Sequence, residues 1–319
     1  MSSTDDIIRG IGEGSIRAIA RALSMVENGS ADSVEVLDKV FSLQSGFSIG
    51  VTGPPGAGKS TLVSRMISRY RSQENTVGVI AVDPSSPFTG GALLGDRIRM
   101  QSHASDPGVF IRSMGSRGHL GGLSGATRDA SLVLSAAGYS PVIIETVGVG
   151  QAEVEVADLA DITLLVLVPG LGDDVQSMKA GIMEIGDIII LNKADRNGID
   201  QLESYVRASL ELMPPGIRKP EVVRVSAVNG DGLENLWKAI DRLAAIHSDE
   251  QRKSRSAIKT LNEILKENGL LFAERLLETQ YNGREAAEEL ILSGTLSPYA
   301  IGKKLLETAE GMLKHNGSK

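Results

Sequence analysis

The chain has 319 residues, of which 41% are hydrophobic and 23% charged, so it is expected to fold as one large α/β domain with helical additions. A formal net charge of −7 argues against a general nucleic-acid-binding surface, and the absence of cysteine excludes disulfides, thiolate metal sites and cysteine nucleophiles. The N-terminus lacks a secretory signal pattern and no apolar run is long enough to span a bilayer, so we expect a cytoplasmic protein without membrane contact.

Residues 1–45 are predicted to form an N-terminal helical extension. A first helix is indicated by apolar residues at helical spacing, ending before Asn28-Gly29; these residues are Ile16, Ile19, Ala20, Leu23 and Val26. A second, shorter helix is indicated by Val34, Leu37 and Phe41.

Residues 46–248 are predicted to form a P-loop nucleotide-binding domain, because short β-branched runs alternate there with helical segments. The predicted strands are Phe47–Val51, Val77–Val82, Val109–Ile111, Val142–Glu145, Thr163–Val168, Ile188–Leu191 and Val222–Val225. Continuous apolar strands separated by helices are typical of a mostly parallel sheet that is covered on both faces. Ligands bind such sheets at the carboxyl ends of the strands, where each motif described below lies.

Residues 249–319 are predicted to form a charged, helical C-terminal extension. Its apolar residues at helical spacing are Ile258, Leu261, Leu265, Phe272 and Leu276. Ser297-Pro298 is a good pair of first residues for a last helix, because serine caps the free N–H groups and proline fits the first helical position.

A phosphate-binding loop follows the first predicted strand. Its sequence matches G-x-x-x-x-G-K-[ST] and reads Gly53, Pro54, Pro55, Gly56, Ala57, Gly58, Lys59, Ser60 and Thr61. The glycines let backbone N–H groups turn towards phosphate oxygens, Lys59 is expected to reach the β- and γ-phosphates, and the Ser60 hydroxyl is expected to bind Mg²⁺. An ordinary glycine-rich turn is the alternative interpretation.

A base-recognition motif, Asn192-Lys193-Ala194-Asp195, ends a later strand. The Asp195 carboxylate accepts hydrogen bonds from the guanine N1–H and amine, and a buried Asp195 would be left unpaired by ATP. We expect Asn192 to hold the loop together, Lys193 to cover the base, and Ser226-Ala227 to bring a backbone N–H to guanine O6. A polar helix-capping turn is the alternative for this motif by itself, but together with the phosphate-binding loop it favours GTP.

Two strand-end carboxylates are candidates for the metal site. Asp83 ends one strand and Glu145 ends another, at the place where a Mg²⁺ ligand is expected, and Gly148 is expected to sense the γ-phosphate. Asp96, in a long Gly- and Pro-rich loop, either completes the Mg²⁺ shell or caps a helix near Arg97. Glu145 has the alternative of capping the next turn.

Other polar residues in these loops have no assigned role. Arg112 and Arg117 lie in a predicted glycine-rich loop and are candidates for contact with the nucleotide or with a partner. Gln151 lies too far beyond Gly148 for us to assign it by analogy with the glutamine of small GTPases. His119 is interpreted as a surface residue, because the four histidines are scattered.

The chain resembles the MeaB/ArgK family of GTPases, whose human member is called MMAA. The matching segments read GPPGAGKST, VDPSSPFTGGALLGDRIRM, RSMGSRGHLGGLS, ETVGVGQAEVEVADLAD, VPGLGDDVQSMKAGIMEIGDI and NKAD. The resemblance implies a GTPase that assists an adenosylcobalamin-dependent acyl-CoA mutase, chiefly methylmalonyl-CoA mutase, by gating cofactor loading and protecting the mutase from inactivation. It also implies dimers formed through the helical extensions.

The same resemblance implies that GTP hydrolysis and Mg²⁺ binding depend on Lys59, Asp83, Asp96 and Glu145, and that residues 176–187 signal to the mutase. An older family label, an ATPase or kinase of lysine/arginine/ornithine transport, is the alternative function, and Asp195 weighs against it. A nickel-insertion GTPase ranks last, because that chemistry favours Cys or clustered His ligands.

Overall fold

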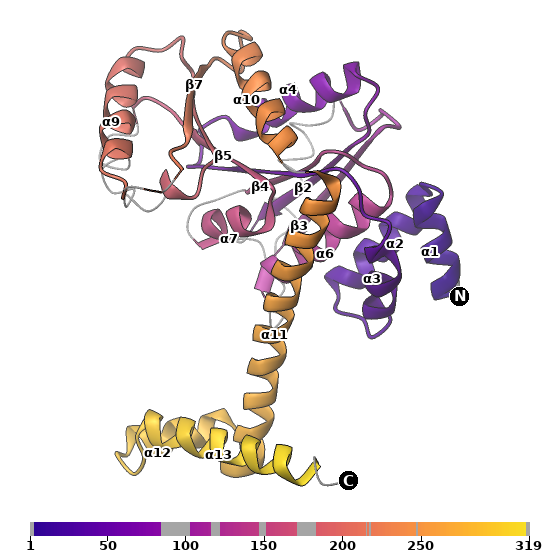
Figure 1. Cartoon of the computed structure of the whole chain (residues 1–319), viewed down its shortest axis with the longest axis vertical. Coiled ribbons are helices and arrows are strands. Elements are labelled where there is room, and N and C mark those ends of the chain that lie inside the picture. Colours follow the sequence, from indigo (N-terminus) through magenta and orange to yellow (C-terminus); the bar gives the residue numbers. More distant parts are fainter. Residues whose placement is uncertain are drawn as a thin grey trace. The chain divides into compact units, whose positions relative to one another are not determined.

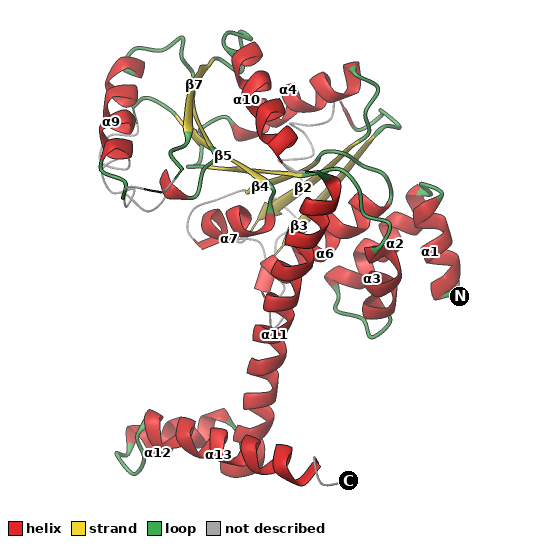
Figure 2. Ribbon diagram, in the orientation of Figure 1, coloured by secondary structure: helices red, strands yellow, loops and turns green. Residues whose placement is uncertain are grey.

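The computed structural model describes residues 3–83, 103–115, 122–146, 151–170, 183–214, 216, 218–246 and 248–316. The chain divides into two compact units, Met1–Ser256 and Ala257–Lys319. Figure 1 follows the chain along its sequence, and Figure 2 colours the same view by secondary structure.

The first unit is built on a seven-stranded parallel sheet with the strand order β3-β2-β4-β1-β5-β6-β7. The strands are β1 Ser48–Thr52, β2 Val77–Asp83, β3 Val109–Gly115, β4 Val142–Thr146, β5 Ile162–Leu167, β6 Ile188–Asn192 and β7 Glu221–Val225. All seven predicted strands are therefore present, and the predicted α/β P-loop fold class with a parallel sheet is confirmed.

Helices cover both faces of this sheet (Figures 1 and 2). Those of the first unit are α1 Thr4–Gly12, α2 Ile16–Glu27, α3 Ser33–Phe41, α4 Lys59–Ser72, α6 Gly122–Ala136, α7 Gln151–Leu159, α9 Ile199–Glu211 and α10 Leu233–Ile246. Alternate strand residues point to opposite faces, so the sheet separates the buried apolar residues into clusters on its two faces.

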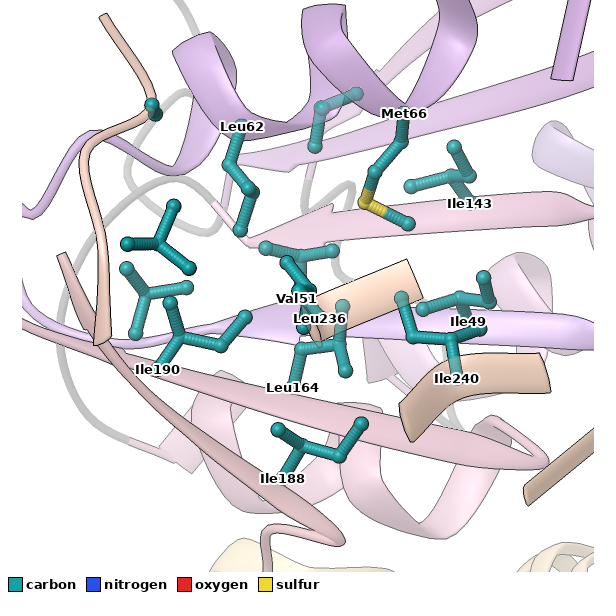
Figure 3. Packing of buried hydrophobic residues seen from close by; sticks show 14 of the residues in the cluster. Ile49, Val51, Leu62, Met66, Ile143, Leu164, Ile188, Ile190, Leu236 and Ile240 are labelled. Carbon is teal, nitrogen blue, oxygen red and sulfur yellow. The ribbon is translucent and has the colours of Figure 1, made fainter. Parts of the chain in front are cut away.

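One core lies between the sheet and helices α4 and α10, and Figure 3 shows it from close by. Ile49, Val51 and Leu164 of the central strands meet Leu62 and Met66 of α4 there. On the opposite face, α6 packs on β2 and β4 and is covered in turn by α1, α2 and α3, while α9 packs on β5 and β6. Burial of continuous apolar strands on both sides fixes the sheet, and with it the edge where the strands end.

The N-terminal helices are an integral part of the first unit. The predicted helices α2 and α3 are present, and an additional helix, α1, precedes them and buries Ile7 and Ile11. The predicted apolar face of α3 is wrong in part: Val36 and Val40 are fully buried, whereas Val34 is exposed. In a nine-residue helix with five apolar residues the spacing fits more than one face, and packing against α1 and α6 selects among them.

The second unit contains most of α11 (Asp249–Tyr281), together with α12 (Arg284–Leu292) and α13 (Pro298–Asn316). Ser297 accepts a hydrogen bond from the Ala300 N–H at 3.1 Å, so the predicted start of the last helix is confirmed. Of the predicted apolar residues in α11 only Leu276 is buried. Within the part of the chain that the structure describes, no helix is both long and apolar enough to cross a membrane.

Candidate functional site

The phosphate-binding loop connects β1 to α4 with a backbone that only glycine fits well. Gly53 has φ 136°, and a Cβ atom there would lie 2.2 Å from the carbonyl oxygen of Val166 on β5. Gly58 is left-handed with φ 88°, and a Cβ there would lie 2.5 Å from the side-chain nitrogen of Asn192. Both glycines are therefore needed for close packing of the loop as well as for its turn.

Lys59, the first residue of α4, folds back over this loop. Its ammonium donates to the carbonyl oxygens of Gly53 and Pro54, the latter at 3.1 Å, and the residue is buried. The motif predicts that the phosphates of a nucleotide bind at this loop. The positive charge that the motif predicts is therefore held at the loop itself.

Ser60 and Glu145 meet at the end of β4. The Ser60 hydroxyl donates to Glu145 Oε1 at 2.6 Å, and Glu145 is almost fully buried. Asp83 is the last residue of β2, the strand next to β4, but its side chain lies outside the described residues, as do Asp96 and Gly148 entirely. The structure thus brings together two of the four predicted metal ligands.

Asn192 joins the phosphate-binding loop to the loop that follows β7. Its side-chain nitrogen donates to the Ala57 carbonyl at 2.7 Å, and its side-chain oxygen accepts from the Ala227 N–H at 3.1 Å. The predicted holding role of Asn192 agrees with this geometry. The Ala227 N–H is engaged by Asn192, so its predicted contact with guanine O6 stays a prediction.

Lys193 and Asp195 follow Asn192 in the predicted order. Lys193 has an uncommon positive φ of 57°, and its ammonium donates to the Gly56 carbonyl at 2.8 Å. Asp195 accepts a hydrogen bond from the Ser226 hydroxyl at 2.6 Å, and this bond holds the pKa of the carboxyl below its usual range. In the chain by itself Asp195 is exposed, because it lies in a turn beyond the end of β6.

Arg65 contacts the loop after β7, and the sequence did not predict this contact. From α4 its guanidinium reaches the carbonyl oxygens of Ala227 and Val228, at 2.8 and 2.6 Å. Arg69 and Arg71 lie on the same helix, and the sequence carries no signal that separates Arg65 from them.

A cavity of about 410 Å³ opens between the start of α4 and the loop after β7. It is lined by Ser60, Thr61, Ser64, Arg65, Ser68 and Val228. Hydroxyl groups and one guanidinium dominate its lining, which suits a polar, anionic ligand. The cavity adjoins both the phosphate-binding loop and the loop that follows β7.

Arg112 does not lie in a loop, as predicted, but in β3, which extends to Gly115. Its guanidinium pairs with the buried Glu27 of α2, so this contact ties the edge strand to the N-terminal helices. The strand is longer than predicted because polar side chains on an edge strand do not show the apolar pattern of a central strand.

Gln151 begins α7, but its side chain lies outside the described residues, as do Arg117 and His119 entirely. Of the predicted signalling segment 176–187, only residues 183–187 are described: Met183 is buried, and Asp187 accepts from the Thr163 N–H at 2.8 Å.

Comparison with known proteins identifies GTPases as relatives of this chain. Residues 19–278 match the family model described as methylmalonyl Co-A mutase-associated GTPase MeaB. The chain is 42% identical to a putative GTPase of Pyrococcus horikoshii over 316 residues, covering 98% of this chain and 100% of that protein. It is 36% identical to the GTPase ArgK of Escherichia coli, covering 94% and 95%.

Two further relatives bear on function. The mouse protein named methylmalonic aciduria type A homolog, mitochondrial, is 32% identical, covering 95% of this chain and 79% of the mouse protein. The crystal structure of a protein named LAO/AO transport system kinase superposes with a TM-score of 0.70 at 26% identity, covering 96% and 97% of the two chains. The predicted resemblance is therefore confirmed: the chain is a GTPase and belongs to the MeaB family of methylmalonyl-CoA mutase-associated GTPases.

Proposed function

We propose that this GTPase hydrolyses GTP with Mg²⁺ and acts as a chaperone for an adenosylcobalamin-dependent acyl-CoA mutase, with methylmalonyl-CoA mutase as the first candidate. In this role it gates loading of the cofactor and protects the mutase from inactivation. The family description and the name of the mouse relative support the choice of partner. The site geometry supports the choice of nucleotide.

The observation that carries the nucleotide assignment is the double hydrogen bond of Asn192. The Asn192 side chain connects Ala57 of the phosphate-binding loop with Ala227 of the loop after β7, and Asp195 follows Asn192 by three residues. A nucleotide whose phosphates lie on the first loop then presents its base to Asp195, whose ionised carboxylate accepts from the guanine N1–H and amine. Adenine lacks these donors, so the arrangement favours GTP over ATP.

The residues beside the phosphates have complementary tasks. Backbone N–H groups of the phosphate-binding loop, which Pro54 and Pro55 cannot supply, surround the phosphate oxygens, and the N-terminus of α4 adds partial positive charge. Lys59 neutralises the β- and γ-phosphates, and Thr61 lines the adjoining cavity. Gly148 is proposed to sense the γ-phosphate through its N–H.

Hard oxygen ligands fit Mg²⁺, and Ser60 and Glu145 supply a hydroxyl and a carboxylate within 2.6 Å of each other. We propose that these two residues, with Asp83 and Asp96, hold the ion, which when bound neutralises charge on the phosphates. We expect phosphate oxygens of the bound nucleotide to complete the shell.

We propose that the chain forms a homodimer through the C-terminal extension, residues 249–319. Exposed apolar residues on α11 recur at helical spacing, namely Ile258, Leu261, Leu265 and Phe272. Such a surface favours association with another protein surface. The N-terminal extension 1–45 and the GTPase domain 46–248 are proposed as the other functional divisions, in a cytoplasmic protein that binds neither nucleic acid nor membrane.

The proposal is tested by measuring GTP turnover and cofactor loading with and without a methylmalonyl-CoA mutase from the same organism. We expect slow turnover alone and faster turnover with the mutase, and Lys59→Ala should abolish both turnover and its stimulation. If the mutase changes neither GTP turnover nor loading of adenosylcobalamin, the chaperone role is wrong.

The alternative is an ATPase or kinase linked to transport of lysine, arginine and ornithine, which the name of the structural relative LAO/AO transport system kinase favours. It requires ATP preference and a phosphorylated acceptor protein. Calorimetric titration with GDP and ADP decides between the two, because only the alternative allows ADP to bind as tightly as GDP.

A further inference from the structure

Arg65 holds two consecutive peptide groups of the loop after β7. Its Nε donates to the Ala227 carbonyl at 2.8 Å, and its Nη2 donates to the Val228 carbonyl at 2.6 Å. A guanidinium is planar, and its donors have a fixed separation, so two such bonds set the angle of the loop as well as its distance from α4.

The consequence of this contact extends beyond the two carbonyls. In a trans peptide the N–H points opposite to the C=O, so a Val228 carbonyl directed at Arg65 turns the Asn229 N–H away from α4. That N–H donates to the Ser226 hydroxyl oxygen at 3.3 Å. The single proton of the same hydroxyl is directed to Asp195, at 2.6 Å.

A series of contacts therefore runs from α4 to the carboxylate that is proposed to read the base. It begins at Arg65, passes through the peptide group between Val228 and Asn229 and through the Ser226 hydroxyl, and ends at Asp195. Because Asp195 is exposed, burial does not fix its side chain, and this hydrogen bond orients it together with one from its own backbone N–H.

We propose that Arg65 is a positioning residue for guanine recognition, which holds the loop after β7 so that Ser226 orients Asp195. The inference rests on the proposed nucleotide site. It assigns Arg65 no direct contact with the reacting phosphates. Its effect falls on the affinity for the guanine base and on the discrimination of the exocyclic amine.

Arg69 provides a matched control on the same helix. Its guanidinium pairs with Asp241 of α10 at 2.6 Å and lies over the Trp237 ring, 5.1 Å from the ring centroid. It therefore connects α4 to α10, whereas Arg65 connects α4 to the loop after β7. Loss of either guanidinium removes a similar tertiary contact, but only loss of Arg65 releases the loop.

The test uses the full chain with Mg²⁺ and compares GDP with IDP, which lacks the exocyclic amine that Asp195 reads. For Arg65→Gln we expect the Kd for GDP to rise about tenfold and the Kd for IDP to rise less, so that the ratio between them shrinks. Arg69→Gln should leave both values within about twofold of wild type. The KM for GTP should rise more than kcat falls.

Arg65→Lys is the second variant, because it keeps the charge and solubility but replaces the two-donor fork by a single ammonium. It should shift the ratio of the two Kd values in the same direction. The inference is overturned if both Arg65 variants keep the wild-type ratio, or if Arg69→Gln changes it equally. Failure of the wild-type chain to bind GDP would instead overturn the proposed nucleotide site, so the two failures are distinguishable.

Discussion

The Ser60 hydroxyl donates to Glu145 Oε1 across 2.6 Å, which joins the first turn of α4 to the carboxyl end of β4. These residues are 85 positions apart in the sequence. The parallel pairing of β1 with β4, in which Val51 lies opposite Glu145, brings them together.

Replacing Glu145 by Gln tests whether this pair holds the metal. The amide keeps the size of the side chain but removes its charge, so we expect GTP turnover to fall about 100-fold and the Mg²⁺ concentration for half-maximal turnover to rise. The check is a Mg²⁺ titration of turnover. Glu234→Gln, at the start of α10 and remote from this pair in the sequence, serves as the control. Unchanged Mg²⁺ dependence in Glu145→Gln would show that the carboxylate is structural.

Asn192→Ala should weaken the fold and the nucleotide site together. It leaves the Ala57 carbonyl and the Ala227 N–H without their amide partner in a buried place, so the free energy of unfolding should fall by about 2–4 kcal/mol. Urea denaturation measures this loss. Asn75→Ala, at an exposed turn, should cost less than about 0.5 kcal/mol. Comparable losses in the two variants would contradict the bridging role of Asn192.

The Ser226–Asp195 bond predicts how GDP affinity depends on pH. Because the hydroxyl lowers the pKa of Asp195, the carboxylate stays ionised below its usual range. Affinity that needs the charge is therefore complete above the usual carboxyl pKa and is lost only as pH falls through the lowered one. Ser226→Ala should raise that pKa and move the loss of affinity to higher pH.

Calorimetric Kd values for GDP at a series of pH values check this shift. Titration of the GDP phosphates is common to all variants and cancels when they are compared at each pH. Ser226→Thr keeps a hydroxyl and should follow the wild-type profile. Coincident profiles for wild type and Ser226→Ala would show that this hydrogen bond does not control base recognition.

Arg112 and Glu27 are expected to stabilise the contact between β3 and α2. Both side chains are at most about one quarter exposed, so Arg112→Met should lower the free energy of unfolding by about 2–3 kcal/mol. Adding Glu27→Leu should restore part of that loss, because it removes the buried carboxylate as well. Urea denaturation of the single and double variants measures both effects. A single variant as stable as wild type would rule out this stabilising role.

The sequence predicted most of the sheet because its central strands are buried on both faces. A strand that is buried on both faces is apolar at every position, so it can be recognised from its sequence without knowledge of its neighbours. The run Ile188–Leu191 is an example. The edge strand β3 was predicted too short. Arg112 and Ser113 are only partly buried and polar, so they interrupt the apolar run by which a strand is recognised. Helix α1 was missed although its sequence carries a signal: Ser3 and Asp6 form a capping box, and Ile7 and Ile11 lie one helical turn apart and are buried.

The sequence by itself determined the class of fold and the order of the nucleotide motifs, since the phosphate-binding loop and the Asn-Lys-x-Asp segment are local patterns of adjacent residues. Only the tertiary structure decided which distant groups meet: Ser60 with Glu145, Asn192 with both loops, and Arg65 with the carbonyls of Ala227 and Val228. The physical reason is that hydrogen bonds depend on position and direction in space. Strand order, register and helix packing set these, and no spacing along the chain records them.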